Sequence, residues 1–74
     1  MGFVSESFAD LNSKYMRRMG LKNVDVIRLL GLTAPTWYRY KRRPWTIPQG
    51  VLREYVKIMR LSKDDVVKIM EAYR

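Results

Sequence analysis

The chain has 74 residues, the length of one small domain, and it contains neither cysteine nor histidine. Disulfide bonds and the usual zinc and iron–sulfur sites are therefore excluded. Its 15 lysines and arginines against 7 acids give a formal net charge of +8 and a pI near 10.2. This balance indicates a polyanionic partner, nucleic acid first and an anionic membrane surface second, although a generally solvated basic surface has the same composition.

The N-terminal sequence MGFVSES has neither the basic segment nor the apolar segment of a secretory signal. No apolar run in the chain approaches the roughly 20 residues that span a bilayer. We therefore expect a protein of the cytoplasm, in a bacterial cell or a phage-infected host, with no membrane partner.

Apolar residues recur at helical spacing, and no sustained period-two alternation predicts a strand. The first predicted helix runs from about Ser5 to Met19 and ends at Gly20, a residue type that favours helix C-termini. The second runs from Asn23 to Leu30, with Asn23 as the candidate N-cap. Gly31 then begins a tight turn.

A third helix is predicted from Ala34 to about Arg42, with Thr33 as its N-cap. On a helical wheel, one face of this helix carries residues at i, i+3, i+4 and i+7 spacing. These residues are Pro35, Tyr38, Arg39 and Arg42. Trp37 and Tyr40 fall on the opposite face, so we expect them to pack on the core.

Two capping boxes predict where the last two helices begin. Thr46 and Gln49 have the spacing of one box, and Ser62 and Asp65 have the spacing of the other. The helices that they open are expected to end near residues 59 and 73. The predicted fold is therefore all-α, a single domain (1–74) of about five short helices.

The outward face of the third helix offers groups that can contact DNA. The Arg39 guanidinium can donate two parallel hydrogen bonds to a guanine edge, worth roughly 1–3 kcal/mol of discrimination. Arg42 and Arg43 lie at the helix end and suit phosphates, although a solvated cationic helix end is the alternative interpretation. Trp45 can lie against a sugar or fill the core under the loop, and we expect the core.

The chain resembles a known family in three segments: GLKN at 20–23, VIRLLGLT at 26–33 and WYRY at 37–40. In order and spacing these are similar to the helix-turn-helix of the phage Cro and CI repressor superfamily, also called XRE-type or lambda-repressor-like. With Gly31 at the family's turn glycine, the helix-turn-helix unit covers about 23–42. Lys22 stands where the family usually has a threonine cap, which moves the expected cap to Asn23.

The resemblance implies that the third helix is a recognition helix in the major groove of DNA. By position, the base-facing residues are Ala34, Pro35, Tyr38 and Arg39. Phosphate contacts are expected from Asn23, Thr33, Thr36, Lys41, Arg42 and Arg43. The backbone amides near Gln49 are a further expected phosphate site, unless the capping box already satisfies them.

One recognition helix reads only a few base pairs, so we expect a homodimer, at least on DNA, and an operator that is an inverted repeat. Surplus apolar residues on the last two helices form its surface in one interpretation and close the core in the other. These residues are Val51, Tyr55, Ile58, Val66, Met70 and Tyr73.

The sequence thus predicts a regulator of transcription that binds specific double-stranded DNA, a repressor of the phage or plasmid type. The alternative is an antitoxin-type helix-turn-helix protein, which binds a protein partner and autoregulates its operon. An enzyme is not expected, because histidine and cysteine are missing and the adjacent Asp64 and Asp65 do not converge on a helix. No cofactor, metal or small-molecule effector is expected.

Overall fold

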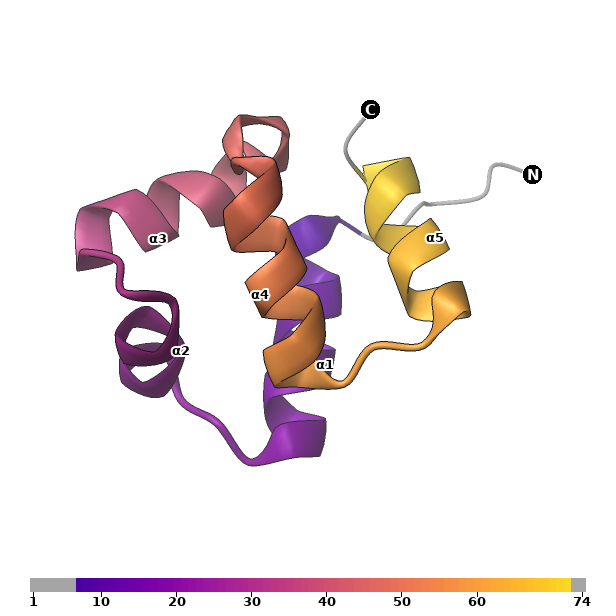
Figure 1. Cartoon of the computed structure of the whole chain (residues 1–74), viewed down its shortest axis with the longest axis horizontal. Helices are drawn as coiled ribbons and strands as arrows, with labels where there is room; N and C mark the ends of the chain where they lie inside the picture. The colour runs from indigo at the N-terminus through magenta and orange to yellow at the C-terminus, as the bar shows by residue number, and fades with distance from the viewer. Residues whose placement is uncertain (1–6, 73–74) are drawn as a thin grey trace.

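Five α-helices and one 3-10 turn account for most of residues 7–72, the part of the chain that the computed structural model describes. In chain order the elements are α1 (Phe8–Met19), α2 (Asn23–Leu30), α3 (Ala34–Arg42), η1 (Pro44–Thr46), α4 (Gln49–Met59) and α5 (Lys63–Ala72). In Figure 1, α4 crosses in front of α1 at the centre, with α2 and α3 on one side and α5 on the other. The predicted all-α fold of five short helices is confirmed.

Residues with clear local preferences set the boundaries of α1 and the end of α2. Helix α1 begins at Phe8, and the Ser7 side chain caps it by accepting a hydrogen bond from a backbone N–H in the first turn. The predicted start at Ser5 lies outside the described residues. Gly20 and Gly31 end α1 and α2 with φ of 69° and 67°, left-handed conformations that glycine adopts without steric cost.

The N-cap of α2 is Lys22, so the predicted cap at Asn23 is wrong. The Asp25 carboxylate accepts a hydrogen bond from the Lys22 backbone N–H at 2.9 Å, and Asn23 becomes the first residue of the helix. In α3 the predicted cap is confirmed, because the Thr33 hydroxyl accepts from the Thr36 backbone N–H at 3.4 Å. The side chain of Asn23 is thereby left for contacts beyond its own helix.

Helix α4 begins at Gln49, and the capping box predicted from Thr46 is wrong. A proline disfavours a helical conformation in the residue before it, and Ile47, which precedes Pro48, is extended with φ −70° and ψ 122°. The Thr46 hydroxyl donates instead to the backbone carbonyl of Arg43 at 2.7 Å. The first amides of α4 are therefore not capped by Thr46.

The core is centred on three aromatic rings from three helices: Phe8 of α1, Trp37 of α3 and Tyr55 of α4. Their ring centroids are 5.5–6.4 Å apart in tilted and edge-on arrangements, which are favourable geometries for aromatic pairs. The predicted burial of Trp37 and Tyr40 is confirmed. Other buried apolar side chains are Leu11, Tyr15, Val26, Ile47, Leu52, Met59 and Ile69.

The second tryptophan, Trp45, is 61% exposed, so its predicted place in the core is wrong. The 3-10 turn η1 buries the neighbouring Pro44 and directs Trp45 outward. Ile47, a little further along the chain, fills the core in its place. One short turn thus decides which of three apolar residues becomes surface.

A buried hydrogen bond connects α1 and α4 through the core. The Tyr55 hydroxyl donates to the Asn12 side-chain oxygen at 2.7 Å, and each residue is 2% exposed. A buried polar group needs such a partner to offset the loss of its hydration. Tyr55 is therefore a core residue of the single chain, and its predicted place on a dimer surface is wrong.

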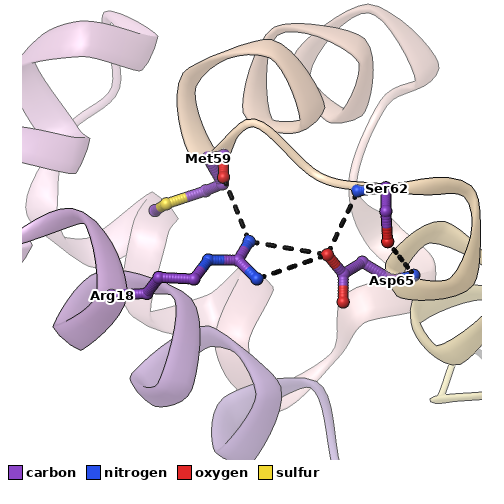
Figure 2. A network of polar contacts seen from close by, with 4 residues as sticks. All are labelled: Arg18, Met59, Ser62 and Asp65. Carbon is purple, nitrogen blue, oxygen red and sulfur yellow. Dashed lines mark hydrogen bonds and ion pairs between the residues drawn. The ribbon is translucent and has the colours of Figure 1, made fainter.

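Helix α5 is held to the rest of the fold by a polar network, drawn in Figure 2. The predicted capping box is confirmed: the Ser62 hydroxyl accepts from the Asp65 N–H at 3.2 Å, and the Asp65 carboxylate accepts from the Ser62 N–H at 3.1 Å. Arg18 of α1 donates to the same carboxylate at 3.4 Å and to the Met59 backbone carbonyl at 3.2 Å. The bond from Ser62, followed by the charge of Arg18, keeps the pKa of Asp65 below its ordinary value.

Candidate nucleic-acid interface

Helix α3 separates its residues onto two faces, as the sequence predicts. Trp37 and Tyr40 are buried, and the Trp37 ring packs against Phe8 of α1 and Tyr55 of α4. The opposite face is exposed and consists of Ala34, Pro35, Tyr38, Arg39 and Arg42. A helix anchored along one side therefore presents a phenol and two guanidiniums at fixed positions.

The stretch around α3 is positively charged and has no acid to balance it. Residues 26–53 include no Asp or Glu, but they include Arg28, Arg39, Lys41, Arg42, Arg43 and Arg53. The ion pairs found among residues 7–72 are Arg18–Asp65 and Lys57–Glu54, which both use cations outside this stretch. The positive potential over α3 is thus available to an anionic partner.

The side chain of Asn23 joins the start of α2 to the buried side of α3. Its oxygen Oδ1 accepts hydrogen bonds from Trp37 Nε1 at 3.1 Å and from Lys41 Nζ at 3.2 Å. The Lys41 ammonium also lies 4.4 Å from the ring centroid of Tyr38, a cation–π distance. Partial burial lowers the pKa of Lys41. Lys41, a predicted phosphate ligand, is therefore already engaged within the protein.

Two of the predicted phosphate ligands, Thr33 and Thr36, lie together at the start of α3. Thr33 is exposed, and its hydroxyl donates to the hydroxyl of Thr36 at 2.9 Å while it also caps the helix. The hydroxyl proton of Thr36 is then left for another acceptor. The two threonines enclose the proposed base-facing residues Ala34 and Pro35 in the chain.

The other predicted phosphate ligands gather where α3 ends and α4 begins. Arg42 and Arg43 are exposed, and Gln49 is exposed in the first turn of α4. Because the predicted capping box does not form, no side chain at the N-cap position satisfies the backbone N–H groups of Gln49 and Gly50. Exposed cations and helix N-terminal amides together make this corner suitable for phosphate.

A cleft of about 450 Å³ lies between α1 and α3, and the sequence did not predict it. It is lined by Ala9, Ser13, Tyr38, Lys41 and Arg42. The α1 residues that form its wall are small, which leaves the space open beside the exposed face of α3. Small residues on a helix carry no sequence signal of a cleft, since the space depends on how α1 and α3 pack.

The apolar residues predicted for a dimer surface differ in exposure. Val51, Ile58 and Val66 are half-buried, whereas Met70 is 45% exposed. Tyr73 lies outside the described residues. Val67 is 55% exposed beside Met70 on α5, so this pair is the apolar surface that α5 presents.

Among residues 7–72, no group of three or more acidic side chains is placed to hold a metal ion. Within the same range, no helix is both long enough and apolar enough to cross a membrane. Comparisons with models of protein families, with curated proteins and with solved structures find no match to this chain.

Proposed function

We propose that this protein is a transcriptional regulator that binds specific double-stranded DNA by inserting α3 into the major groove. The resemblance to phage Cro and CI repressors favours a repressor that occupies a promoter in the cytoplasm of a bacterial cell or an infected host. Tyr38 and Arg39 are the residues that read bases by hydrogen bonding. Ala34 and Pro35 contribute apolar contacts, for example to a thymine methyl group.

The observation that carries this proposal is the exposed Arg39 on a helix whose opposite side is buried through Trp37 and Tyr40. Its guanidinium has no acidic partner among residues 7–72 and lies 5.8 Å from the ring centroid of Tyr40, a cation–π distance. Two parallel hydrogen bonds to a base edge form only when the donor pair is held in a defined orientation. A wrong base cannot accept both bonds, and each mismatched base pair therefore costs about 1–3 kcal/mol. A rigid helix with an outward guanidinium meets this requirement. A flexible basic segment supports only nonspecific binding.

The proposed phosphate ligands lie at both ends of α3. Thr33 and Thr36 are near its start, and Arg42 and Arg43 are near its end. Asn23, the first residue of α2, contacts Trp37 and Lys41 further along α3. The amides of Gln49 and Gly50 extend the second group onto α4. Contacts on both sides of a recognition helix fix its register on the duplex, while the base contacts supply specificity.

The proposed partner is a second copy of the chain, which doubles the length of DNA that is read. Val67 and Met70 on α5 are the exposed apolar pair that supports a surface for protein contact. The same pair supports the second candidate, an antitoxin-type regulator that also binds a different protein. Both candidates share the DNA-binding face, and they differ in what covers α5.

The proposal is tested by selecting from a randomised duplex library at about 150 mM salt and then measuring the salt dependence of the best duplex. A regulator of this kind enriches a discrete site, and a dimer enriches an inverted repeat with half-sites about one helical turn apart. A single asymmetric site removes the dimer but keeps the DNA function. Binding without enrichment, which fades as salt rises, would overturn specific recognition.

A further inference from the structure

The contacts of Asn23 define the orientation of its amide without ambiguity. Its two partners, the Trp37 indole N–H and the Lys41 ammonium, can only donate hydrogen bonds, and both are directed at the same oxygen, at 3.1 and 3.2 Å. The reversed amide would place its NH₂ group against two donors. The oxygen is therefore held toward α3, and the Nδ2 group is directed away from these partners.

The residues that hold Asn23 are themselves fixed. Trp37 is 1% exposed and packs against Phe8 and Tyr55. Lys41 is half-buried, and its ammonium lies 4.4 Å from the Tyr38 ring centroid and 5.9 Å from that of Trp37. A side chain held by two such partners loses little further freedom when it binds a ligand.

From these contacts we infer that Lys41 and Trp37 are positioning residues, which hold the Asn23 Nδ2 group ready to donate a hydrogen bond to a DNA phosphate. This inference rests on the proposed DNA-binding function. Lys41 then acts on the DNA mainly through Asn23 and not as a separate phosphate ligand. The acid in the same turn, Asp25, is directed back at the Lys22 N–H at 2.9 Å, so it does not occupy the amide.

The arrangement also couples the phosphate contact to the recognition helix. Lys41 is on α3 and Asn23 is on α2, so the amide is in place only when the two helices are packed as observed. Tyr38, proposed as a base-facing residue, contacts the same ammonium. The inferred network therefore links one base-facing side chain to one phosphate ligand through a single lysine.

The first test is Asn23→Asp, which keeps an oxygen acceptor for Trp37 and Lys41 but removes the Nδ2 donor and adds a negative charge. We expect unfolding in urea to be unchanged or to need more denaturant. Affinity for the selected duplex and for an unrelated duplex should both fall by about tenfold or more, since a phosphate contact carries no sequence information. Lys68→Ala on α5 is the control, because it changes the net charge equally at an exposed site on another helix.

The second test is a double-mutant cycle on DNA affinity with Lys41→Met and Asn23→Ala. Coupled residues give non-additive effects. Lys41→Met should therefore weaken binding about tenfold with Asn23 present and less than about twofold with alanine at that position. Urea unfolding of each variant shows that the folded protein is being compared.

The outcomes separate this inference from the proposed function. If the native chain selects a duplex but Asn23→Asp binds it as well as the native chain does, the inference is wrong while the DNA function stands. Additive losses in the cycle would make Lys41 an independent phosphate ligand and would also overturn it. If the native chain selects no duplex at all, the proposed function fails first, and this inference fails with it.

Discussion

At two of the polar junctions between helices a cation is bound, and the two junctions differ in whether an acid neutralises it. At the α2–α3 junction, Lys41 donates to the neutral amide of Asn23. At the α1–α5 junction, Arg18 donates to the carboxylate of Asp65 and to a backbone carbonyl. In each case a long cationic side chain spans two helices. The α1–α5 junction contains an acid, Asp65, whereas the α2–α3 junction contains none at the Lys41 ammonium.

This difference separates charge that is neutralised within the fold from charge that stays available to a partner. The Arg18–Asp65 pair cancels its own field, so it stabilises the fold without attracting an anion. The Lys41–Asn23 contact stabilises the fold and leaves the positive charge in place, within a stretch that has no acid from residue 26 to residue 53. Such a stretch raises the local concentration of a polyanion near α3.

The largest expected effect comes from removing the anchor of the α2–α3 junction. Trp37→Ala leaves a cavity among the core aromatics and removes a hydrogen bond to Asn23. The free energy of unfolding should therefore fall by about 3–5 kcal/mol. Urea denaturation followed by circular dichroism measures this loss. Trp45→Ala is the matched control, because that side chain is 61% exposed and should change stability by less than about 0.5 kcal/mol. Equal losses from both substitutions would contradict the packing described here.

The next effect concerns base recognition by Arg39. Arg39→Ala should lose about 1–3 kcal/mol of preference for the selected duplex over one changed at a single base pair. Arg39→Lys is the control that keeps the charge but lacks the planar fork of the guanidinium. We expect it to retain nonspecific affinity and still lose the preference, measured by competition binding. An equal loss of affinity on every duplex would assign Arg39 to the phosphates.

The α1–α5 junction should contribute less, and its contribution should depend on pH. The pKa of Asp65 is lowered in the folded state, chiefly by the Ser62 N–H. Its stabilising effect is therefore present above the unfolded-state pKa of about 3.9 and is lost as the pH falls through the lower folded-state value. Asp65→Asn should cost about 1 kcal/mol at pH 7, since Arg18 is partly exposed. This difference in unfolding free energy should shrink as the pH falls below the unfolded-state pKa.

Asp64→Asn is the control for that measurement. Asp64 is exposed at the adjacent position of α5, and no hydrogen bond or ion pair of its side chain is found among the described residues. Its substitution should leave the acid limb of the stability curve unchanged. If the two variants behave alike, the network in Figure 2 does not stabilise the α1–α5 junction.

The same comparison shows which parts of the molecule were predictable from sequence. Local signals act within one turn, so the cap at Thr33, the C-cap at Gly20 and the box at Ser62 and Asp65 are predicted correctly. The box at Thr46 was wrong because Pro48 holds the residue before it in an extended conformation. The restriction on a residue before proline therefore overrides the capping pattern at this position.

The candidate DNA-binding surface is predictable in its outline but not in its contacts. Helical spacing placed Tyr38 and Arg39 outward and Trp37 inward, because one face of a short helix must pack on the core. The bond from Lys41 to Asn23 joins residues 18 positions apart, and no periodic pattern specifies such a pair. The cleft beside Ser13 depends likewise on the packing of α1 against α3.

The smallest expected effect, and the sharpest test of paired against unpaired charge, is the salt dependence of DNA binding. Arg42→Ala and Arg43→Ala each remove an exposed cation without an ion partner among the described residues. The slope of log affinity against log salt is negative, and each substitution should reduce its magnitude by about 0.9. Lys68→Ala removes the same charge from α5, across the molecule from α3 in Figure 1. Because counterion release requires close phosphate contact, its slope should match that of the native chain. A uniform reduction in all three variants would mean that net charge alone governs binding, and that the acid-free stretch has no special position on the DNA.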